Sequence, residues 1–136
     1  MSFSGSCLCG TITYSVSAKP DTTALCHCSD CKKWSGSAFS ANAIVPRDSF
    51  KLQTGQPSYY DTIGTSGKKN RHFFCTKCGS SLYAELEVMA DKTVLKAGTL
   101  EGEDSGMNGA VNIEFFTQHR SPYLRAIDEA KQVRGF

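Results

Sequence analysis

Two short stretches decide the fold: CLCG at residues 7–10 and CTKCG at residues 75–79. Alternate residues of an extended segment point the same way, and a C-x-x-C turn folds two thiols toward one point. A tetrahedral zinc holds its sulfur ligands about 4 Å apart, so each pair is shaped to bind metal. Each pair supplies two ligands, and together they form a closed site. We therefore predict a structural zinc bound by Cys7, Cys9, Cys75 and Cys78.

A third cluster, CHCSDC at residues 26–31, brings three thiols into one short segment. Three thiols can converge on an ion without help from elsewhere in the chain, and they leave one coordination position open. We predict a second zinc here, bound by Cys26, Cys28 and Cys31, which are also the candidate catalytic residues. In an alternative pairing, the first pair joins two members of this cluster, but that arrangement would leave the pair at residues 75–79 without partners.

The fourth ligand of the second zinc decides whether that site is reactive. The chain contains three histidines, His27, His72 and His119. If Cys26 and Cys28 face the ion along an extended segment, His27 faces away from it. We place His72 near the structural site or the surface, and His119 has no local ligand partner. A histidine cap would leave the zinc saturated and inert, so we favour an open position filled by water or by a substrate thiolate.

An open three-thiolate zinc suits thiol chemistry. It binds an incoming thiol as thiolate by lowering its pKa below the free value of about 8.5. The thiolate can add to a small carbonyl compound, and the reverse reaction breaks a carbon–sulfur bond. Residues near the cluster are candidates to hydrogen-bond the rest of the substrate or to form the pocket wall: Ser29, Lys32, Ser35, Ser37, Trp34 and Phe39.

Length and composition limit the class of protein. The 136 residues predict a single domain over residues 1–136 with one ordinary core. We find no apolar run of about 18 residues, which predicts no membrane span. The first residues lack the charged-then-apolar order of a signal peptide, so we expect a cytoplasmic protein or, alternatively, a nuclear one. The odd number of cysteines, seven, favours metal over disulfides in such a reducing compartment.

The charge of the chain argues against nucleic acid as a partner. The formal net charge is +2, but two zinc ions and seven thiolates would bring it to about −1. The basic residues are dispersed, and we find no stripe of interleaved basic and aromatic residues. The sequence leaves the oligomeric state open.

Hydrophobic alternation predicts a mainly β fold with many short strands. We expect strands at residues 10–17, 37–45, 50–53, 59–63, 71–75, 81–87, 93–99 and 111–116. A short C-terminal helix is expected over residues 122–133, because Pro122 lies early, Leu124 and Ile127 share a face, and Gly135 follows its end.

Three blocks of sequence together resemble the glutathione-dependent formaldehyde-activating enzyme family, also called the GFA or centromere-protein-V domain family. The blocks are residues 5–14 (GSCLCGTITY), 26–37 (CHCSDCKKWSGS) and 74–82 (FCTKCGSSL). The resemblance continues through residues 97–100 and 116–136 and covers nearly the whole chain. As a joint pattern it is highly specific, whereas a C-x-x-C pair alone is a weak signal.

The resemblance implies the β-tent fold, a zinc-bearing scaffold of stacked antiparallel sheets, with two zincs per chain divided between the cysteines as above. It also implies a carbon–sulfur lyase of the S-(hydroxymethyl)glutathione synthase type, which acts on glutathione or a small thiol adduct. The alternatives are a glutathione-binding carrier without catalysis and a structural zinc module, chromatin-contacting or chaperone-like, because a shared fold does not fix function.

Overall fold

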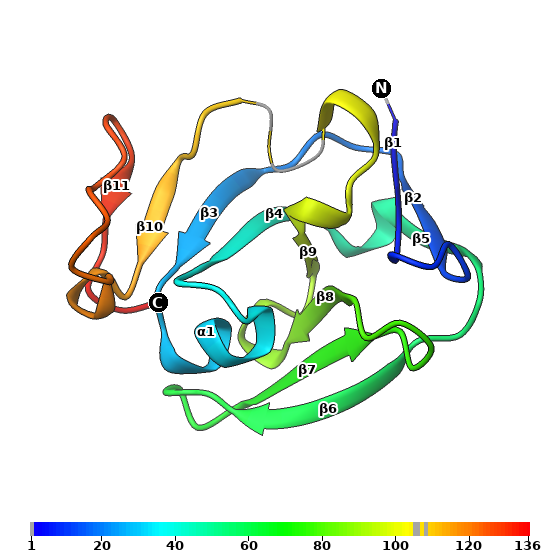
Figure 1. The fold of residues 1–136 in the computed structure, drawn as a ribbon, viewed down its shortest axis with the longest axis horizontal. Coiled ribbons are helices and arrows are strands. Elements are labelled where there is room, and N and C mark those ends of the chain that lie inside the picture. Colours follow the sequence, from blue (N-terminus) through cyan, green and yellow to red (C-terminus); the bar gives the residue numbers. More distant parts are fainter. Residues whose placement is uncertain (1, 105–106, 108) are drawn as a thin grey trace.

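The computed structural model describes residues 2–104, 107 and 109–136. Within these residues the chain is mainly β and forms two sheets and one short α-helix (Figure 1). The smaller sheet has the order β1-β2-β5 and is antiparallel. Its strands are β1 (Phe3–Ser6), β2 (Thr13–Val16) and β5 (Phe50–Thr54).

The larger sheet has eight strands in the order β11-β10-β3-β4-β9-β8-β7-β6. It is antiparallel from β3 to β6, whereas β10 runs parallel to both of its neighbours. Its strands are β3 (Thr22–Cys26), β4 (Ser40–Pro46), β6 (Ser58–Ile63), β7 (Lys69–Phe74), β8 (Ser81–Leu86), β9 (Lys92–Lys96), β10 (Ile113–Phe115) and β11 (Lys131–Gln132).

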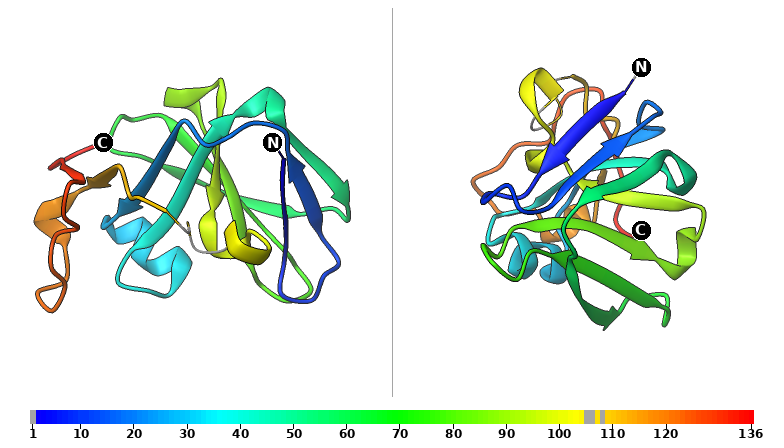
Figure 2. Two further views of the ribbon diagram at one scale, coloured as in Figure 1. Left: turned by 90° about the horizontal axis from the view of Figure 1, so that it is seen from above. Right: turned by 90° about the vertical axis from the view of Figure 1, so that its right-hand side faces the viewer.

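The helix α1 (Ser29–Ser35) directly follows the end of β3. Among the described residues, five 3-10 turns connect other elements: Arg47–Ser49, Glu87–Met89, Ala97–Thr99, Gly102–Asp104 and Thr117–His119. The smaller sheet and the pair β10–β11 lie at opposite ends of the molecule (Figure 2). The described part of the chain contains no helix with the length and apolar character needed to cross a bilayer.

The main core lies between the two sheets. Tyr14 and Val16 of β2 are almost completely buried, as expected for alternate residues that face the interior. From the larger sheet, the same core receives Ala43, Val45, Leu82, Tyr83 and Leu95. Burial of the Tyr14 hydroxyl raises its pKa to about 12, and the hydroxyl lies 2.8 Å from Thr99 Oγ1.

The central strands β4 and β9 present a different set of side chains to each face of the larger sheet. Residues Ala43, Val45 and Leu95 join the core against the smaller sheet. On the other face, Ile44 and Val94 belong to a second apolar cluster. Cross-strand pairing holds these positions in register, with Asn42 opposite Lys96 and Ile44 opposite Val94. The second face is the one that carries the candidate site.

The mainly β prediction is confirmed, and every predicted strand corresponds to an observed one with slightly shifted ends. The sequence interpretation missed β1, β3, β11 and α1. The predicted C-terminal helix is wrong, because residues 122–133 form turns and then β11. Amide groups at the end of this segment bond to β10 and to the residue before it: Lys131 N donates to Asn112 O at 2.9 Å, and Val133 N donates to Glu114 O at 2.9 Å.

We predict that Gly5→Ala destabilises the fold, because a Cβ at this position would overlap the ring of its cross-strand partner Tyr14. Overpacking of this kind costs about 1–3 kcal/mol. Urea unfolding of the purified variants measures the change. Gly98→Ala is the matched control, since its added Cβ would meet no atom within 4 Å. Equal midpoints for the two variants would contradict this packing.

Candidate functional site

The two cysteine pairs meet, as predicted, where the connection from β1 to β2 approaches the connection from β7 to β8. The four sulfur atoms, those of Cys7, Cys9, Cys75 and Cys78, all lie within 4.8 Å of one another. The Sγ atoms of Cys7 and Cys9 are 3.6 Å apart, and those of Cys9 and Cys75 are 3.9 Å apart. A tetrahedral zinc with sulfur bonds of about 2.3 Å needs separations of about 3.8 Å, so this donor set fits the ion.

Tight turns bring each pair together. Gly10 and Gly79 follow the two pairs and adopt φ values of 78° and 79°, a left-handed conformation that glycine takes without strain. Gly10 N donates to Cys7 O at 3.1 Å, and Gly79 N donates to Cys75 O at 2.8 Å. All seven cysteines are free thiols. The two cysteine pairs therefore lie on turns of the same kind, each closed by a glycine and each suited to binding a metal.

The third cluster forms where β3 ends and α1 begins. Cys26 is the last residue of β3, and Cys28 is the N-cap of α1, where its sulfur accepts a hydrogen bond from Cys31 N at 3.3 Å. The three Sγ atoms lie within 4.8 Å of one another, which fits three ligands of one zinc. In the described part of the chain, this group contains no histidine and no carboxylate.

The three thiols differ in acidity because they share hydrogen bonds. Bonds from Cys26 and Cys28, assisted by the positive charge of Lys96, lower the pKa of the Cys31 thiol. Hydrogen bonds with Cys28 and Cys31, together with burial, raise the pKa of Cys26. Burial lowers the pKa of Lys96, whereas the charges of the cysteines oppose that shift. A lysine ammonium is thus electrostatically coupled to the cysteine cluster.

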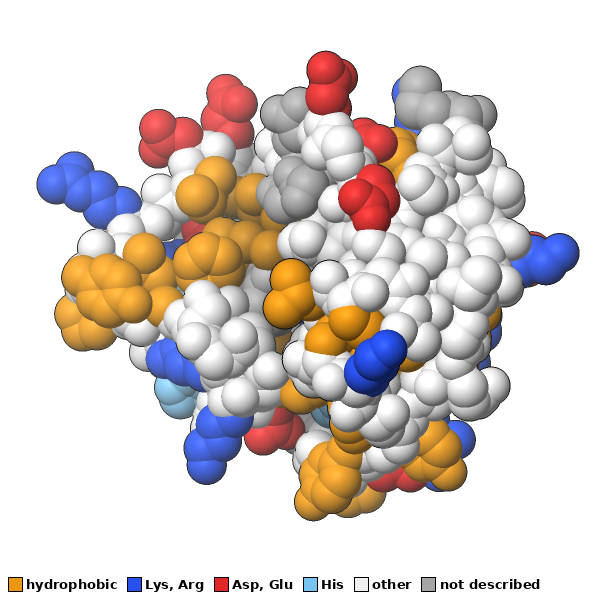
Figure 3. Space-filling view, turned by 45° about the vertical axis from the view of Figure 1, so that its right-hand side comes forward, with side chains coloured by type: hydrophobic (Ala, Val, Ile, Leu, Met, Phe, Trp, Pro, Cys, Tyr) orange, Lys and Arg blue, Asp and Glu red, His pale blue; other side chains and the backbone are white. Residues whose placement is uncertain are grey.

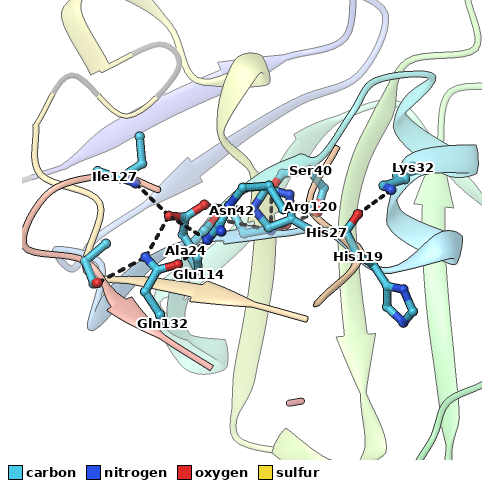
Figure 4. Close-up of polar contacts among 11 residues, drawn as sticks. Ala24, His27, Lys32, Ser40, Asn42, Glu114, His119, Arg120, Ile127 and Gln132 are labelled. Carbon is cyan, nitrogen blue, oxygen red and sulfur yellow. Dashed lines mark hydrogen bonds and ion pairs between the residues drawn. The ribbon is translucent and has the colours of Figure 1, made fainter. Parts of the chain in front are cut away.

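His27 points away from the cysteine cluster, as predicted. Its ring is 1% exposed, and Nε2 lies 2.7 Å from Oε1 of Glu114, which is also 1% exposed (Figure 4). His27 N donates to Phe115 O at 3.1 Å. The residue between Cys26 and Cys28 is therefore fixed to β10 through both its backbone and its side chain.

Glu114 also holds the C-terminal segment. Its Oε2 accepts hydrogen bonds from Ile127 N and from Gln132 Nε2, both at 2.8 Å (Figure 4). Arg120 adds an ion pair at 3.4 Å. Burial opposes ionisation of this carboxyl, but the bonds from Gln132, Ile127 and His27 together hold its pKa below the ordinary value. One buried carboxylate thus connects the cysteine segment with residues 120–136.

A cavity of about 790 Å³ opens beside the three cysteines. Its floor is the second face of the larger sheet, where Ile44, Ala84 and Val94 are buried and Asn42 and Lys96 supply polar groups. The polar side chains of Ser29, Asp30, Asn70, His72 and His119 also line the cavity.

His72 is a correction to the sequence interpretation. It was expected near the structural site or the surface, but β7 pairs it with Ala84 of β8, and it lines the cavity instead. The Trp34 ring packs against the cavity floor and meets the His72 ring edge-on, with the two ring centroids 4.6 Å apart. Burial lowers the pKa of His72.

Of the polar residues proposed near the cluster, Ser29 lines the cavity, Lys32 bonds to a distant part of the chain, and Ser35 and Ser37 make local contacts. Lys32 Nζ donates to His119 O at 2.6 Å, and Ser35 Oγ donates to Cys31 O at 2.7 Å. Ser37 N donates to Ser35 Oγ at 3.2 Å. Lys96 was missed, because its place beside the cysteines depends on the pairing of β4 with β9.

Aromatic residues close one side of the cavity. Phe115, Phe116 and Phe136 line it, and the Phe115 and Phe136 rings stack with their centroids 5.1 Å apart. Hydrophobic side chains gather on the side of the molecule where β10 and β11 lie (Figure 3). The Lys and Arg side chains on the face shown are scattered and form no continuous basic patch. Phe136 is 54% exposed, so the cavity is bordered by a residue open to solvent.

Comparison with known proteins supports the sequence resemblance. The model of the family described as "Glutathione-dependent formaldehyde-activating enzyme" matches residues 2–119. A crystal structure of a Rhodobacter sphaeroides protein from Northeast Structural Genomics superposes on this chain with a TM-score of 0.60 and 21% identity. The match covers 79% of this chain and 96% of that one. At this identity, the structural match shows a shared fold.

We predict that Glu114→Gln destabilises the protein by about 2–4 kcal/mol, because it removes a buried charge that receives several hydrogen bonds. Urea unfolding measures the loss, and hydrogen exchange at Ile127 N and Val133 N reports the release of the C-terminal segment. The control is Glu129→Gln, an exposed carboxylate on the same segment. Unchanged protection at both amides would show that Glu114 does not anchor this segment.

Proposed function

Because the chain belongs to the glutathione-dependent formaldehyde-activating enzyme family, we propose that it is a zinc-dependent enzyme that forms or breaks a carbon–sulfur bond. The proposed substrates are a thiol, glutathione or a smaller one, and a small carbonyl compound such as formaldehyde. The corresponding product is an S-hydroxymethyl adduct. We further propose that the two sheets are arranged as in the β-tent fold that the resemblance implies.

The observation that carries this proposal is the convergence of three thiols on the wall of a cavity. Cys26, Cys28 and Cys31 meet without a fourth ligand in the described part of the chain. His27, the nearest histidine in sequence, is turned toward Glu114. This supports a metal with one coordination position left for the substrate. The four-thiol cluster, by contrast, has the complete ligand set of a structural site.

A zinc ion bound by the three cysteines would lower the pKa of an incoming thiol and keep it as a thiolate, which is the nucleophile. In the reaction, the sulfur bonds to the carbonyl carbon. The thiol loses its proton and the carbonyl oxygen gains one, so neither reactant is oxidised or reduced. Cleavage of the adduct reverses these changes.

The residues of the chain contribute position and environment. The backbone of α1 and the bonds of His27 to β10 fix the cysteine segment. The apolar floor formed by Ile44, Ala84 and Val94 limits water beside the reacting atoms. His72 and His119 line the same cavity, where an imidazole can accept the thiol proton or return it. We place this activity in a reducing compartment, the cytosol or the nucleus, because the thiols must stay reduced.

We predict different outcomes for two matched substitutions. Cys28→Ser should remove one of the two zinc ions and abolish acceleration of adduct formation from glutathione and formaldehyde, yet leave the protein folded. Cys78→Ser should instead unfold it, because the four-thiol cluster connects the two sheets. Metal analysis, circular dichroism and exchange NMR of the adduct make the three measurements.

Three results would overturn the enzymatic proposal. Full turnover by Cys28→Ser would show that the three-cysteine cluster is not the reactive site. Glutathione binding by the zinc-loaded wild-type protein without any acceleration would instead support the carrier alternative. A wild-type protein that keeps two zinc ions but binds no thiol would indicate a structural zinc module.

A further inference from the structure

The floor of the cavity holds one lysine, Lys96, whose charge has no carboxylate partner in the described part of the chain. Its Nζ donates to Asn42 Oδ1 at 2.5 Å and lies 5.0 Å from the centroid of the Trp34 ring. An ammonium group has three N–H donors, so this geometry leaves donor capacity unused. A ligand in the cavity can supply the missing acceptor.

The position of Lys96 follows from strand register and is not that of a flexible surface chain. Lys96 ends β9 and pairs with Asn42 of β4, which in turn pairs with Ala24 of β3, two residues before Cys26. All four of these residues line the cavity. The ammonium and the three thiols therefore line the same cavity, and the pairing of β3, β4 and β9 fixes their places.

The rest of the floor is apolar. Ile44, Ala84 and Val94 are 8%, 2% and 7% exposed, and Leu86 and Met89 pack against them. A ligand whose sulfur reaches the cysteine cluster and whose anion reaches Lys96 would lay the remainder of its body on this surface. Burial of that surface favours hydrocarbon by about 25 cal/mol per Å² and disfavours charged groups left without partners.

Glutathione matches this floor poorly. It carries two carboxylates and one ammonium, whereas the fixed charges that line the cavity are those of Lys96 and Asp30, together with two titratable histidines. A volume of about 790 Å³ is also far larger than a formaldehyde adduct of a minimal thiol needs. The better match is a thiol with one carboxylate and a hydrocarbon body.

Building on the function proposed above, we infer that Lys96 is a specificity-determining residue that pairs with a carboxylate of the thiol substrate. The substrate class is a mercaptocarboxylic acid, or its hydroxymethyl adduct, with an apolar chain between sulfur and carboxylate. Lys96 acts in binding and takes no part in making or breaking the carbon–sulfur bond.

A pair of thiols that differ in one group tests this inference. We expect the zinc-loaded wild-type protein to bind 6-mercaptohexanoate at least about tenfold more tightly than 6-mercaptohexanol, and also more tightly than glutathione. In Lys96→Met, the preference for the carboxylate should fall to near unity with zinc content unchanged, because any effect of the lost charge on the cysteine cluster is common to both hexyl thiols. Lys96→Arg should keep the preference, and Lys51→Met, on the exposed face of β5, should resemble the wild type. Calorimetry gives each affinity.

The possible results separate the inference from the function on which it rests. An equal loss of both hexyl thiols in Lys96→Met would mean that Lys96 only balances the charge of the cysteines, and would overturn the inference. The inference would also be overturned if the wild-type protein bound both hexyl thiols equally well, or if it bound glutathione more tightly than 6-mercaptohexanoate. In either case the protein would still bind a thiol, so the proposed function would stand. If none of the three thiols binds, the proposed function fails and the inference falls with it.

Discussion

In β4 and β9, successive side chains point to opposite faces, and both faces are used. Leu95 enters the core between the sheets, while its neighbours Val94 and Lys96 enter the cavity. Because the period is two, a slip of one residue would place Lys96 in the core and Leu95 beside the cysteines. The core and the cavity therefore impose the same register, and the remaining strands of the larger sheet extend from this pair.

The two cysteine clusters differ in what they join. The cluster of four gathers residues from the connections β1–β2 and β7–β8, so a metal there would link the two sheets and close a long segment of chain. The cluster of three comes from the end of β3 and the start of α1, so a metal there would close only a short loop. The four-cysteine cluster is therefore suited to stabilising the fold. The three-cysteine cluster contributes less to the fold and is better suited to binding and releasing a ligand.

The features that could be predicted from the sequence are those that depend on residues close together in the chain. Both cysteine clusters were found because the spacing within each cysteine motif is local, and the direction of His27 away from the three-cysteine cluster followed from alternation along one segment. Lys96 could not be found, because its contact with Asn42 joins residues 54 positions apart. The C-terminal helix was predicted from the spacing of Leu124 and Ile127, but hydrogen bonds from this segment to Glu114 and β10 outweighed that weak preference.

Phe136 stacks on Phe115 and borders the cavity, although it is the last residue described. Any peptide joined after Phe136, such as a purification tag or a fusion partner, would begin at the entrance to the cysteine-lined chamber. A polyhistidine sequence attached there would bring metal-binding imidazoles next to thiols that are themselves proposed to hold zinc. Expression vectors that add their tag before Met1 avoid this interference, so measurements of metal stoichiometry are best made on protein prepared in that way.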